Sequence, residues 1–219
     1  MKKRILIFGD SNVWGYIPGS GERFPEDIRW TGIVRGLLGE DCVILEDGVS
    51  SRTTLFEDLR FPCRNGKVGL GYTLAAQAPL DLVVLALGIN DLKYGDAVAS
   101  RKGLEELIRL LEQADACFPL PGGSRNFPSG LKLLIVSPIP LHPDIAILRP
   151  DSSLRNGYRE SLRYPALYAQ AAQAHGAWFL DAAKIARPSA VDGVHMDAES
   201  HLAVGRAAAG KIREILALP

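Results

Sequence analysis

The chain has 219 residues, and its 25 lysines and arginines balance 25 aspartates and glutamates, so the formal net charge is zero. Hydrophobic residues at 47% and charged residues at 23% are ordinary globular values, which exclude a disordered or low-complexity chain. The balanced charge leaves no electrostatic footprint for nucleic acid or an anionic membrane, so we predict neither as a partner. A chain of this length suits one folding unit, and we expect residues 1–219 to form a single domain.

The cysteines are widely spaced and form no CxxC pair, which argues against a disulfide framework or a zinc ribbon and fits a reducing compartment. They are Cys42, Cys63 and Cys117. Basic residues at 2–4 precede a short apolar run, but that run ends well before the roughly 7–15 residues of a signal-peptide core. The longest apolar stretch, Leu82–Leu87, is far shorter than the about 20 residues that span a bilayer. We therefore expect a cytoplasmic protein.

Short apolar runs alternate with longer helical patterns along the chain, and this alternation indicates a parallel α/β sheet. Most of the runs are continuously apolar rather than alternating, as expected for strands covered by helices on both faces. The expected strands are Arg4–Phe8, Cys42–Glu46, Leu82–Leu87, Leu131–Ser137 and Ala177–Leu180.

Between the expected strands, apolar residues recur at helical spacing. The expected helices are Trp30–Leu38, Lys102–Ala114, Tyr158–Ala174 and Ala198–Leu216. We expect Pro165 to start or kink a helix and Asp197 to cap the last one. Residues 117–130 and 138–155 are rich in proline, glycine, aspartate and serine, so we expect irregular loops there. Long loops at strand ends are common sites of substrate selection, so we expect residues 16–28, 54–66 and 138–155 to shape a ligand pocket. The sequence leaves the detailed roles of 117–130 and 138–155 open.

Side chains able to do acyl-transfer chemistry follow several of the expected strands. Ser11 comes directly after the first strand, where doubly wound sheets bind ligands, although a turn or N-cap serine is an equally good interpretation by itself. Asp192 stands three residues before His195, so its carboxylate can turn back to the Nδ1–H and leave Nε2 free to deprotonate a serine. An isolated pair of this kind is more often a loop carboxylate beside a solvated histidine. Its pairing with Ser11 at one sheet edge favours catalysis.

Acyl transfer also needs hydrogen-bond donors where negative charge develops on the carbonyl oxygen. Gly48 follows the second strand and could present its backbone N–H there. Asn90 follows the third strand and could offer its side-chain amide. Both residue types are also common in simple turns after strands. All these features fall at carboxyl ends of strands or in the equivalent loop, which predicts one site at one edge of the sheet.

In chain order, Gly9-Asp10-Ser11, Gly48, Gly88-Ile89-Asn90-Asp91 and Asp192-Gly193-Val194-His195 resemble the four sequence blocks of the SGNH (GDSL) hydrolase family. The resemblance spans nearly the whole chain and implies a flavodoxin-like three-layer α/β/α sandwich with a five-stranded parallel sheet. It also implies a serine esterase in which Ser11 is the nucleophile, His195 the base and Asp192 its orienting partner. The implied oxyanion hole consists of the backbone N–H groups of Ser11 and Gly48 and the side chain of Asn90.

Residues 9–15, 29–32 and 46–54 are similar to the bacterial arylesterase/acyltransferase branch of this family. One departure is Asn12, which stands where the four-letter motif has leucine. The position follows the nucleophile and is not a member of the triad, so the departure affects the expected local packing and acyl pocket rather than the triad.

Proximity in sequence to the nucleophile and to Gly48 suggests further residues that line or support the substrate pocket. These candidates are Asp10, Asn12, Trp14 and Arg52. Plain core is at least as good an interpretation for Trp14, because aromatic residues dominate cores. Asp10 and Asp91 fit anchors of their turns better than groups that transfer protons.

Three other patterns predict no function. Residues 205–211 match the start of a phosphate-binding loop, but Ile212 replaces the required serine or threonine and no strand precedes them. Four residues resemble a metal cluster but lack a metal-ligand spacing, so we predict neither a metal nor another cofactor. They are His195, Asp197, Glu199 and His201. The GxSxG pattern of α/β-hydrolases is absent from the sequence.

We therefore expect a cofactor-free serine esterase that hydrolyses short-chain aryl or alkyl esters through an acyl-enzyme, with acyl transfer to alcohols as a second outcome. The alternatives within the family are a carbohydrate O-deacetylase and a thioesterase or lysophospholipase. The non-enzymatic alternative is an inactive binding protein with an esterase fold. The intact triad argues against this alternative. Phe56, Leu59 and Phe61 indicate a subunit contact or an apolar lid. Because relatives are often oligomeric, we expect a homo-oligomer.

Overall fold

A single parallel sheet forms the centre of the computed structural model, which describes residues 2–58 and 61–218. Its strands follow the order β2-β1-β3-β4-β5, and every neighbouring pair is parallel. The bounds are Lys3–Gly9 for β1, Cys42–Gly48 for β2, Leu82–Ala86 for β3, Leu133–Val136 for β4 and Trp178–Leu180 for β5. All five expected strands are present, with ends that differ by one or two residues from the prediction.

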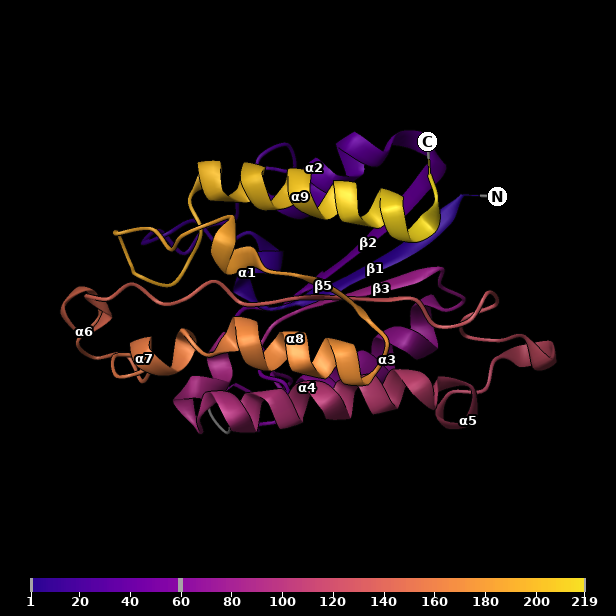
Figure 1. Ribbon diagram of the computed structural model, residues 1–219, viewed down its shortest axis with the longest axis horizontal. Coiled ribbons are helices and arrows are strands. Elements are labelled where there is room, and N and C mark those ends of the chain that lie inside the picture. Colours follow the sequence, from indigo (N-terminus) through magenta and orange to yellow (C-terminus); the bar gives the residue numbers. More distant parts are fainter. Residues whose placement is uncertain (1, 59–60, 219) are drawn as a thin grey trace.

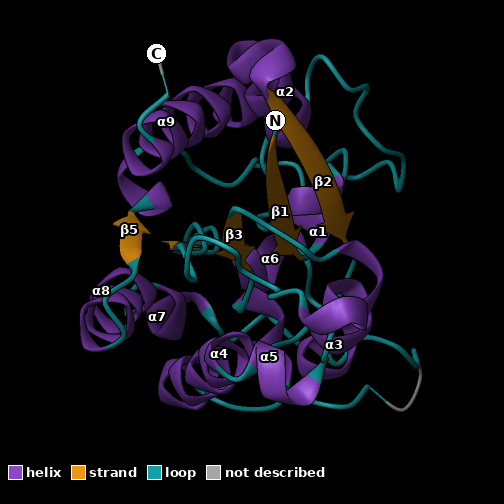
Figure 2. Ribbon diagram, turned by 90° about the vertical axis from the view of Figure 1, so that its right-hand side faces the viewer, coloured by secondary structure: helices purple, strands orange, loops and turns teal. Residues whose placement is uncertain are grey.

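Helices cover both faces of the sheet (Figures 1 and 2). On one face lie α2 (Trp30–Leu38) and α9 (Ala198–Leu216), which pack against each other. The other face carries α3 (Gly66–Gln77), α4 (Ala97–Glu112) and α8 (Tyr164–Ala174). This is the three-layer α/β/α sandwich that the resemblance implies.

Short helices occupy the connections. The α-helical turns are α1 (Ser11–Trp14), α5 (Ala114–Cys117), α6 (Ile145–Leu148) and α7 (Tyr158–Ser161). The 3₁₀ turns are η1 (Gly39–Asp41), η2 (Ile89–Lys93), η3 (Pro121–Gly123) and η4 (Ala182–Lys184). The two segments expected to be irregular, 117–130 and 138–155, therefore contain η3 and α6 between stretches of loop.

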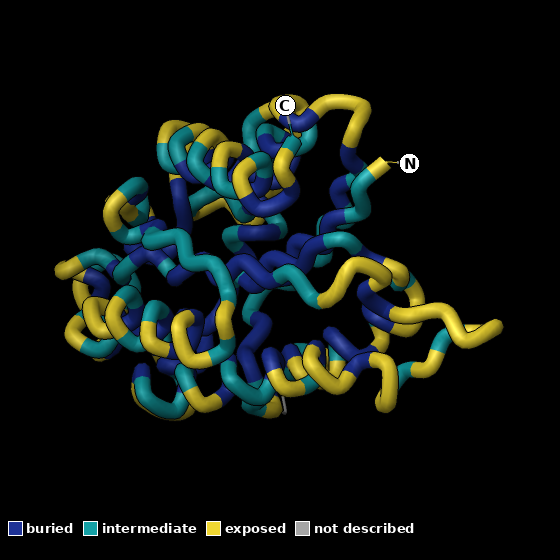
Figure 3. The backbone as a smooth tube through the Cα atoms, turned by 45° about the vertical axis from the view of Figure 1, so that its right-hand side comes forward, coloured by how far each residue is buried: buried dark blue, intermediate teal, exposed yellow. Residues whose placement is uncertain are grey.

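The core is divided by the sheet into two apolar layers, and the buried backbone runs through the middle of the molecule (Figure 3). Alternate residues of β1 enter opposite layers: Ile5 and Ile7 pack under α2 and α9, while Leu6 and Phe8 pack under α3, α4 and α8. Because both faces are buried, the strand is continuously apolar. The sequence pattern therefore has a direct physical cause.

Helix bounds agree with the sequence prediction for two of the four expected helices. Both α2 and α9 have the predicted bounds, and the Asp197 side chain caps α9 by accepting from the Ser200 N–H at 2.8 Å. Helix α4 begins at Ala97 rather than Lys102, because Asp96 caps it. The expected Tyr158–Ala174 helix is two helices, and Pro165 lies in the first turn of the second, as predicted.

Helix α3 is a long helix that the sequence analysis does not predict. It contains Gly66, Gly69 and Gly71, and glycine lowers helix propensity by about 1 kcal/mol per residue relative to alanine. Its start is fixed by Asn65, whose side chain accepts hydrogen bonds from the backbone of the first turn. Packing and capping thus outweigh the weak propensity.

The remaining expectations concern the cysteines, the apolar side chains near residue 60 and membrane-spanning segments. Cys42 is buried, and Cys63 and Cys117 are exposed free thiols. Phe56 stacks on Tyr94 at 5.7 Å, and Phe61 is 51% exposed, whereas Leu59 lies outside the described residues. Within the described chain, no helix has both the length and the apolar character needed to cross a membrane.

Candidate active site

The nucleophile candidate Ser11 is the first residue of α1, immediately beyond the carboxyl end of β1. The Asp10 side chain caps the helix by accepting a hydrogen bond from the Asn12 N–H at 3.0 Å. Helix α1 ends after a single turn at Gly15, whose φ of 88° favours glycine. This tight strand-to-helix connection holds Ser11 at the carboxyl edge of the sheet, where backbone N–H groups at a helix start have no partner inside the helix.

His195 and Asp192 reach Ser11 from the loop that precedes α9. The Ser11 hydroxyl lies 2.9 Å from His195 Nε2, and His195 Nδ1 lies 2.6 Å from Asp192 Oδ2. The other oxygen, Asp192 Oδ1, accepts from the backbone N–H groups of Val194 and His195, each at 3.0 Å. The three side chains that the sequence singled out are thus buried and linked in one chain of hydrogen bonds.

The local electrostatics determine the protonation state of the Asp192 carboxyl group. Burial raises the pKa of Asp192, but the hydrogen bond and charge of His195 and the backbone N–H donors outweigh it and lower the pKa to about 2. The carboxylate is therefore ionised at neutral pH and accepts the Nδ1–H of His195. That tautomer leaves Nε2 as the acceptor for the Ser11 hydroxyl, which is the arrangement that general-base catalysis requires.

Tyr16 begins one of the loops expected to shape the pocket, but sequence reasoning does not single out its side chain. Its ring stacks on the His195 imidazole with centroids 4.1 Å apart and an interplanar angle of 26°. Its backbone N–H donates to the Ser11 carbonyl at 3.0 Å, so the same turn that presents the nucleophile also places the ring. The aromatic residue follows the end of α1 closely, but no one-dimensional pattern indicates that it covers the histidine.

Asn12, the departure from the family motif, connects the two halves of the site. Its Oδ1 accepts from the Met196 N–H at 3.0 Å, directly after His195. Its backbone carbonyl accepts from the Trp30 indole N–H at 3.0 Å. A leucine side chain could make no such hydrogen bond to Met196, so the asparagine has a clear structural role in this chain.

The oxyanion-hole candidates come from neighbouring strands. Asn90 is buried in η2 after β3, and its Nδ2 donates to the Arg52 carbonyl at 3.1 Å. Gly48 ends β2 opposite Gly9 of β1, and a Cβ atom there would overlap the backbone of Trp14. Only glycine allows this approach of β2 to α1. The structure thus places Ser11, Gly48 and Asn90 at one edge, while their role as donors stays a prediction.

Asp91 fastens the segment around Arg52 to η2. It accepts hydrogen bonds from the Thr54 N–H (2.8 Å), the Thr54 hydroxyl (2.6 Å) and the Ser100 hydroxyl (2.8 Å). Burial raises the pKa of Asp91 to about 6, although these hydrogen bonds and Lys93 act in the opposite direction. A fully buried carboxyl with three donors is a structural anchor, as the sequence analysis expected.

A cavity of about 180 Å³ opens beside Ser11 and His195. Most of its lining residues carry hydroxyl, amide or charged groups. Its lining residues are Ser11, Tyr16, Ser50, Ser51, Asn90, Lys93, Arg149, Ser152, Leu154, Val194 and His195. Segment 138–155, whose role the sequence left open, thus contributes one wall.

The four candidate pocket residues are not among the described residues that line this cavity. Asp10 and Asn12 instead line a separate, smaller cavity of about 40 Å³. Burial raises the pKa of Asp10 to about 7 against the opposing effects of the Asn12 N–H, Lys93 and Arg52. Trp14 is half-buried, with Arg23 over its ring at 5.5 Å.

Arg52 is buried beneath the site rather than in the cavity. Its guanidinium lies 3.9 Å from the ring centre of Phe8 and donates to the carbonyls of Gly9 (3.0 Å) and Asp47 (2.6 Å) and to the Asp47 carboxylate (2.8 Å). It therefore ties the ends of β1 and β2 together and supports the cavity from behind.

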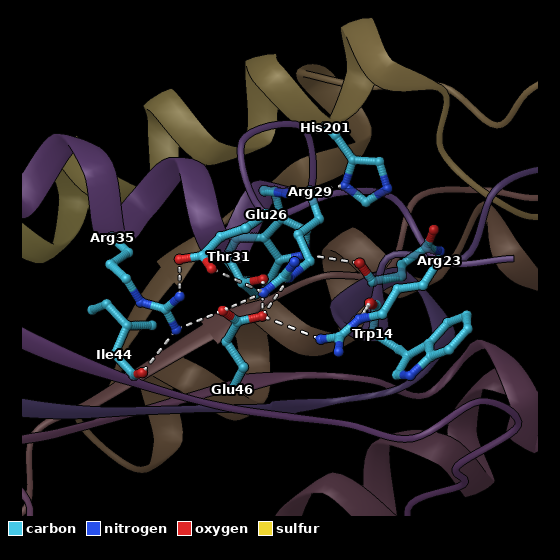
Figure 4. A network of polar contacts seen from close by, with 11 residues as sticks. Trp14, Arg23, Glu26, Arg29, Thr31, Arg35, Ile44, Glu46 and His201 are labelled. Atoms are coloured by element: carbon cyan, nitrogen blue, oxygen red, sulfur yellow. Dashed lines mark hydrogen bonds and ion pairs between the residues drawn. The ribbon is translucent and has the colours of Figure 1, made fainter.

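Glu46 holds helix α2 on the end of β2 (Figure 4). Its carboxylate accepts from Arg29 (2.6 and 3.0 Å), Arg35 (2.6 Å) and the Thr31 hydroxyl (2.8 Å). Arg23 also reaches it, at 3.4 Å. Burial raises the pKa of Glu46, but the donors from Arg29 and Thr31 outweigh it and lower the pKa. This ionic cluster fixes β2 just before Gly48.

The residues that resembled a metal cluster do not form one. In residues 2–58 and 61–218, no group of three or more histidine, cysteine, aspartate or glutamate side chains could hold a metal ion. His201 is buried in α9, and its Nδ1 accepts from the Trp30 N–H at 3.2 Å. Residues 205–211 lie within α9, so no phosphate-binding loop is present there.

Comparison with known proteins agrees with this geometry. Residues 7–203 match the model of the GDSL-like lipase/acylhydrolase family, and the chain belongs to that family. It is an esterase-like enzyme of the acylhydrolase class. No curated protein sequence matches the chain.

Solved structures resemble the whole chain. A carbohydrate acetylesterase family member from Sinorhizobium meliloti has 34% identity and a TM-score of 0.89, with 99% of this chain and 100% of that one covered. The aryl esterase of M. smegmatis has 32% identity and a TM-score of 0.86, with 97% and 99% covered. A lipolytic G-D-S-L family member from Veillonella parvula, at 15% identity, a TM-score of 0.65 and 94% and 96% coverage, shows the fold alone.

Proposed function

We propose that this protein is a serine esterase that hydrolyses short-chain acyl esters of aryl or alkyl alcohols through an acyl-enzyme on Ser11. The observation that carries the proposal is the buried chain from the Ser11 hydroxyl through His195 to Asp192, with distances of 2.9 and 2.6 Å. The cavity beside it gives an ester access to both Ser11 and His195. The similarity to the aryl esterase of M. smegmatis supports the preference for aryl esters.

The mechanism follows from the positions of these groups. Ser11 Oγ attacks the ester carbonyl carbon while its proton passes to His195 Nε2, and Asp192 stabilises the resulting imidazolium. The Ser11 and Gly48 N–H groups and the Asn90 amide stabilise the tetrahedral oxyanion. The carbon–oxygen bond to the alcohol then breaks, and His195 gives its proton to the departing oxygen. Water attacks the acyl-enzyme by the same route and releases the acid, whereas an alcohol as acceptor gives acyl transfer.

A carbohydrate O-deacetylase is the second candidate. The cavity lining carries the hydroxyl groups of Tyr16, Ser50, Ser51 and Ser152, which suit a hydroxylated substrate. The similarity to the carbohydrate acetylesterase family member from Sinorhizobium meliloti supports this candidate. Both candidates use the same chemistry on Ser11 and differ in the alcohol part of the ester.

The test is hydrolysis of 4-nitrophenyl acetate, butyrate, octanoate and palmitate, with acetylated sugars assayed in parallel. We expect rates that fall with acyl length and are lost in Ser11→Ala. A preference for octanoate or palmitate would favour a lysophospholipase or thioesterase, and faster turnover of acetylated sugars would favour the deacetylase. If no ester showed Ser11-dependent turnover, the proposal would be wrong and the binding-protein alternative would replace it.

A further inference from the structure

The cavity beside Ser11 and His195 has positively charged residues in its lining but, among the described residues, no negatively charged ones. Its lining includes the cations Lys93 and Arg149, and among the described residues that line it there is no aspartate or glutamate. The nearest acidic partner of His195, Asp192, is directed at the imidazole and does not line the cavity. A pocket with two cations and no lining carboxylate attracts negative charge.

Arg149 is held in place by its backbone while its side chain remains available. It follows α6, where its N–H donates to the Ile145 carbonyl at 2.9 Å and its carbonyl accepts from the Ser152 N–H at 3.0 Å. The side chain is half-buried, and within the described residues the structure records no hydrogen bond or ion pair of its guanidinium. A guanidinium carries five N–H donors in a planar fork that suits a carboxylate.

Lys93 lines the cavity from a different segment, which also carries the oxyanion-hole candidate Asn90. It lies three residues after Asn90 in the 3₁₀ helix η2, and side chains at this spacing in a 3₁₀ helix eclipse one another. Its charge lowers the pKa of both Asp10 and Asp91 against their burial, so its field reaches the base of the site. The two cations therefore belong to different walls of one cavity.

A simple structural role explains Arg149 less well. A cation at the end of a helix can stabilise it, but α6 has only four residues. Arg155, in the same segment, is an exposed arginine that donates to the Pro150 carbonyl at 3.3 Å and does not line the cavity. Arg149 differs from it by lining the cavity together with Ser11 and His195.

We propose that Arg149 and Lys93 form an anion subsite, so that the preferred substrates are esters that also carry a carboxylate. The inference rests on the proposed esterase activity of the same site and specifies its substrate class. The carboxylate belongs either to the acyl part or to the alcohol part of the ester, and both cations face it from the cavity walls.

The experiment compares esters in matched pairs. For the alcohol part, the pair is 4-acetoxybenzoate and the neutral 4-acetoxybenzamide. For the acyl part, the pair is mono-4-nitrophenyl adipate and 4-nitrophenyl hexanoate. The measured quantity is the ratio of kcat/KM for the charged ester to that for its neutral partner. This ratio is independent of the fraction of active enzyme, so partial misfolding of a variant does not affect it.

We expect this ratio to fall about tenfold or more in Arg149→Gln and in Lys93→Gln for at least one pair, as a lost charge-assisted hydrogen bond implies. Added salt weakens the wild-type preference, because ions screen a partly exposed cation. Arg155→Gln is the matched control, in which the ratio stays at the wild-type value. A ratio that neither cavity variant changes in either pair would overturn the inference.

A binding measurement separates this inference from the proposed activity. Calorimetry with Ser11→Ala measures the affinity for 4-acetoxybenzoate and 4-acetoxybenzamide without turnover. Preferential binding of the carboxylate that is lost in Ser11→Ala/Arg149→Gln supports the anion subsite even if the wild type hydrolyses no ester. Equal affinity within this pair and within the adipate and hexanoate pair, together with Ser11-dependent hydrolysis of neutral esters, would leave the esterase intact and refute the subsite.

Discussion

The side-chain amide of Asn90 has two N–H bonds, and the resting structure uses one of them. Its Nδ2 donates to the Arg52 carbonyl at 3.1 Å, which fixes the orientation of the amide. The second N–H is then available to a developing oxyanion. The buried position of Asn90 strengthens such a hydrogen bond, because water does not compete for it.

Asn90→Ala should therefore lower kcat by about 10²–10³, as loss of one oxyanion donor does elsewhere. The same change leaves the Arg52 carbonyl without its donor and should lower the free energy of unfolding by about 1 kcal/mol. Steady-state kinetics and urea denaturation measure the two effects separately. Asn65→Ala is a matched control, since it removes the cap of α3 at a similar cost of about 1 kcal/mol but should leave kcat unchanged. Near-normal kcat in Asn90→Ala would exclude the oxyanion role.

Asn12 acts through its neighbours rather than on a substrate, and we class it as a positioning residue. Asn12→Leu restores the family's leucine but removes the acceptor of the Met196 N–H, directly after His195. We expect kcat to fall about tenfold or more, because small displacements of catalytic groups have large effects on rate. Asn12→Asp retains an acceptor oxygen and should recover most of the activity. An equal fall of kcat in both variants would show that the hydrogen bond to the Met196 N–H does not determine the rate.

At the scale of elements, the contact between α2 and α9 sets the position of His195, because α9 begins just after that residue. The two helices approach closely at Gly205. A Cβ atom there would lie 2.8 Å from Ile33 Cγ2 and 3.1 Å from the Trp30 carbonyl oxygen. Gly210, in the same helix, is exposed, and no atom would lie within 4 Å of an added Cβ.

Alanine substitutions at these two glycines should thus have opposite effects. Gly205→Ala should lower the free energy of unfolding by about 1–3 kcal/mol, because it overpacks the α2–α9 contact. Gly210→Ala should raise it by about 0.5–1 kcal/mol, since alanine has the higher helix propensity and meets no neighbour. Urea denaturation of both variants measures the difference. An increase in both variants would mean that helix propensity, not close packing, determines the effect at Gly205.

The predictable elements are those whose sequence pattern has a local cause. The strands were recognisable because burial on both faces makes them continuously apolar, and α2 and α9 because one face of each is apolar. The glycine-containing helix α3 is not recognisable from its sequence, because capping and tertiary packing stabilise it. Ser11, Gly48, Asn90 and His195 were placed together from the rule that parallel strands end at one edge.

The cavity walls could not be predicted in the same way. Tyr16 and Arg149 reach the site through the paths of loops, which no periodicity encodes. The pocket residues inferred from proximity along the chain, such as Arg52, instead lie behind the site. Distance along the sequence is a poor guide to which way a side chain faces after a tight turn.

At the scale of the whole molecule, buried titratable groups make stability depend on pH in opposite directions. Burial lowers the pKa of His201 from 6.5 to about 4, although Asp197 opposes this effect, so the folded protein keeps the histidine neutral. Burial raises the pKa of Asp10 to about 7 and that of Asp91 to about 6, so these carboxyls favour the fold more as pH falls from 7 to 4. Asp192, with its pKa lowered to about 2, supports the fold above pH 3.8 and loses that contribution below it.

The contribution of His201 can be isolated by difference. The unfolded chain binds a proton at this histidine below pH 6.5, whereas the folded protein does not until about pH 4, so stability is lost in that interval. His201→Gln keeps an acceptor oxygen for the Trp30 N–H but does not titrate. The free energy of unfolding of the wild type, minus that of His201→Gln, should therefore fall by about 3 kcal/mol between pH 7 and pH 4. Because Asp10, Asp91 and Asp192 are present in both proteins, their contributions cancel in this difference. Urea denaturation at both pH values measures it, and a difference that does not change with pH would mean that the folded protein protonates His201 as readily as the unfolded chain does.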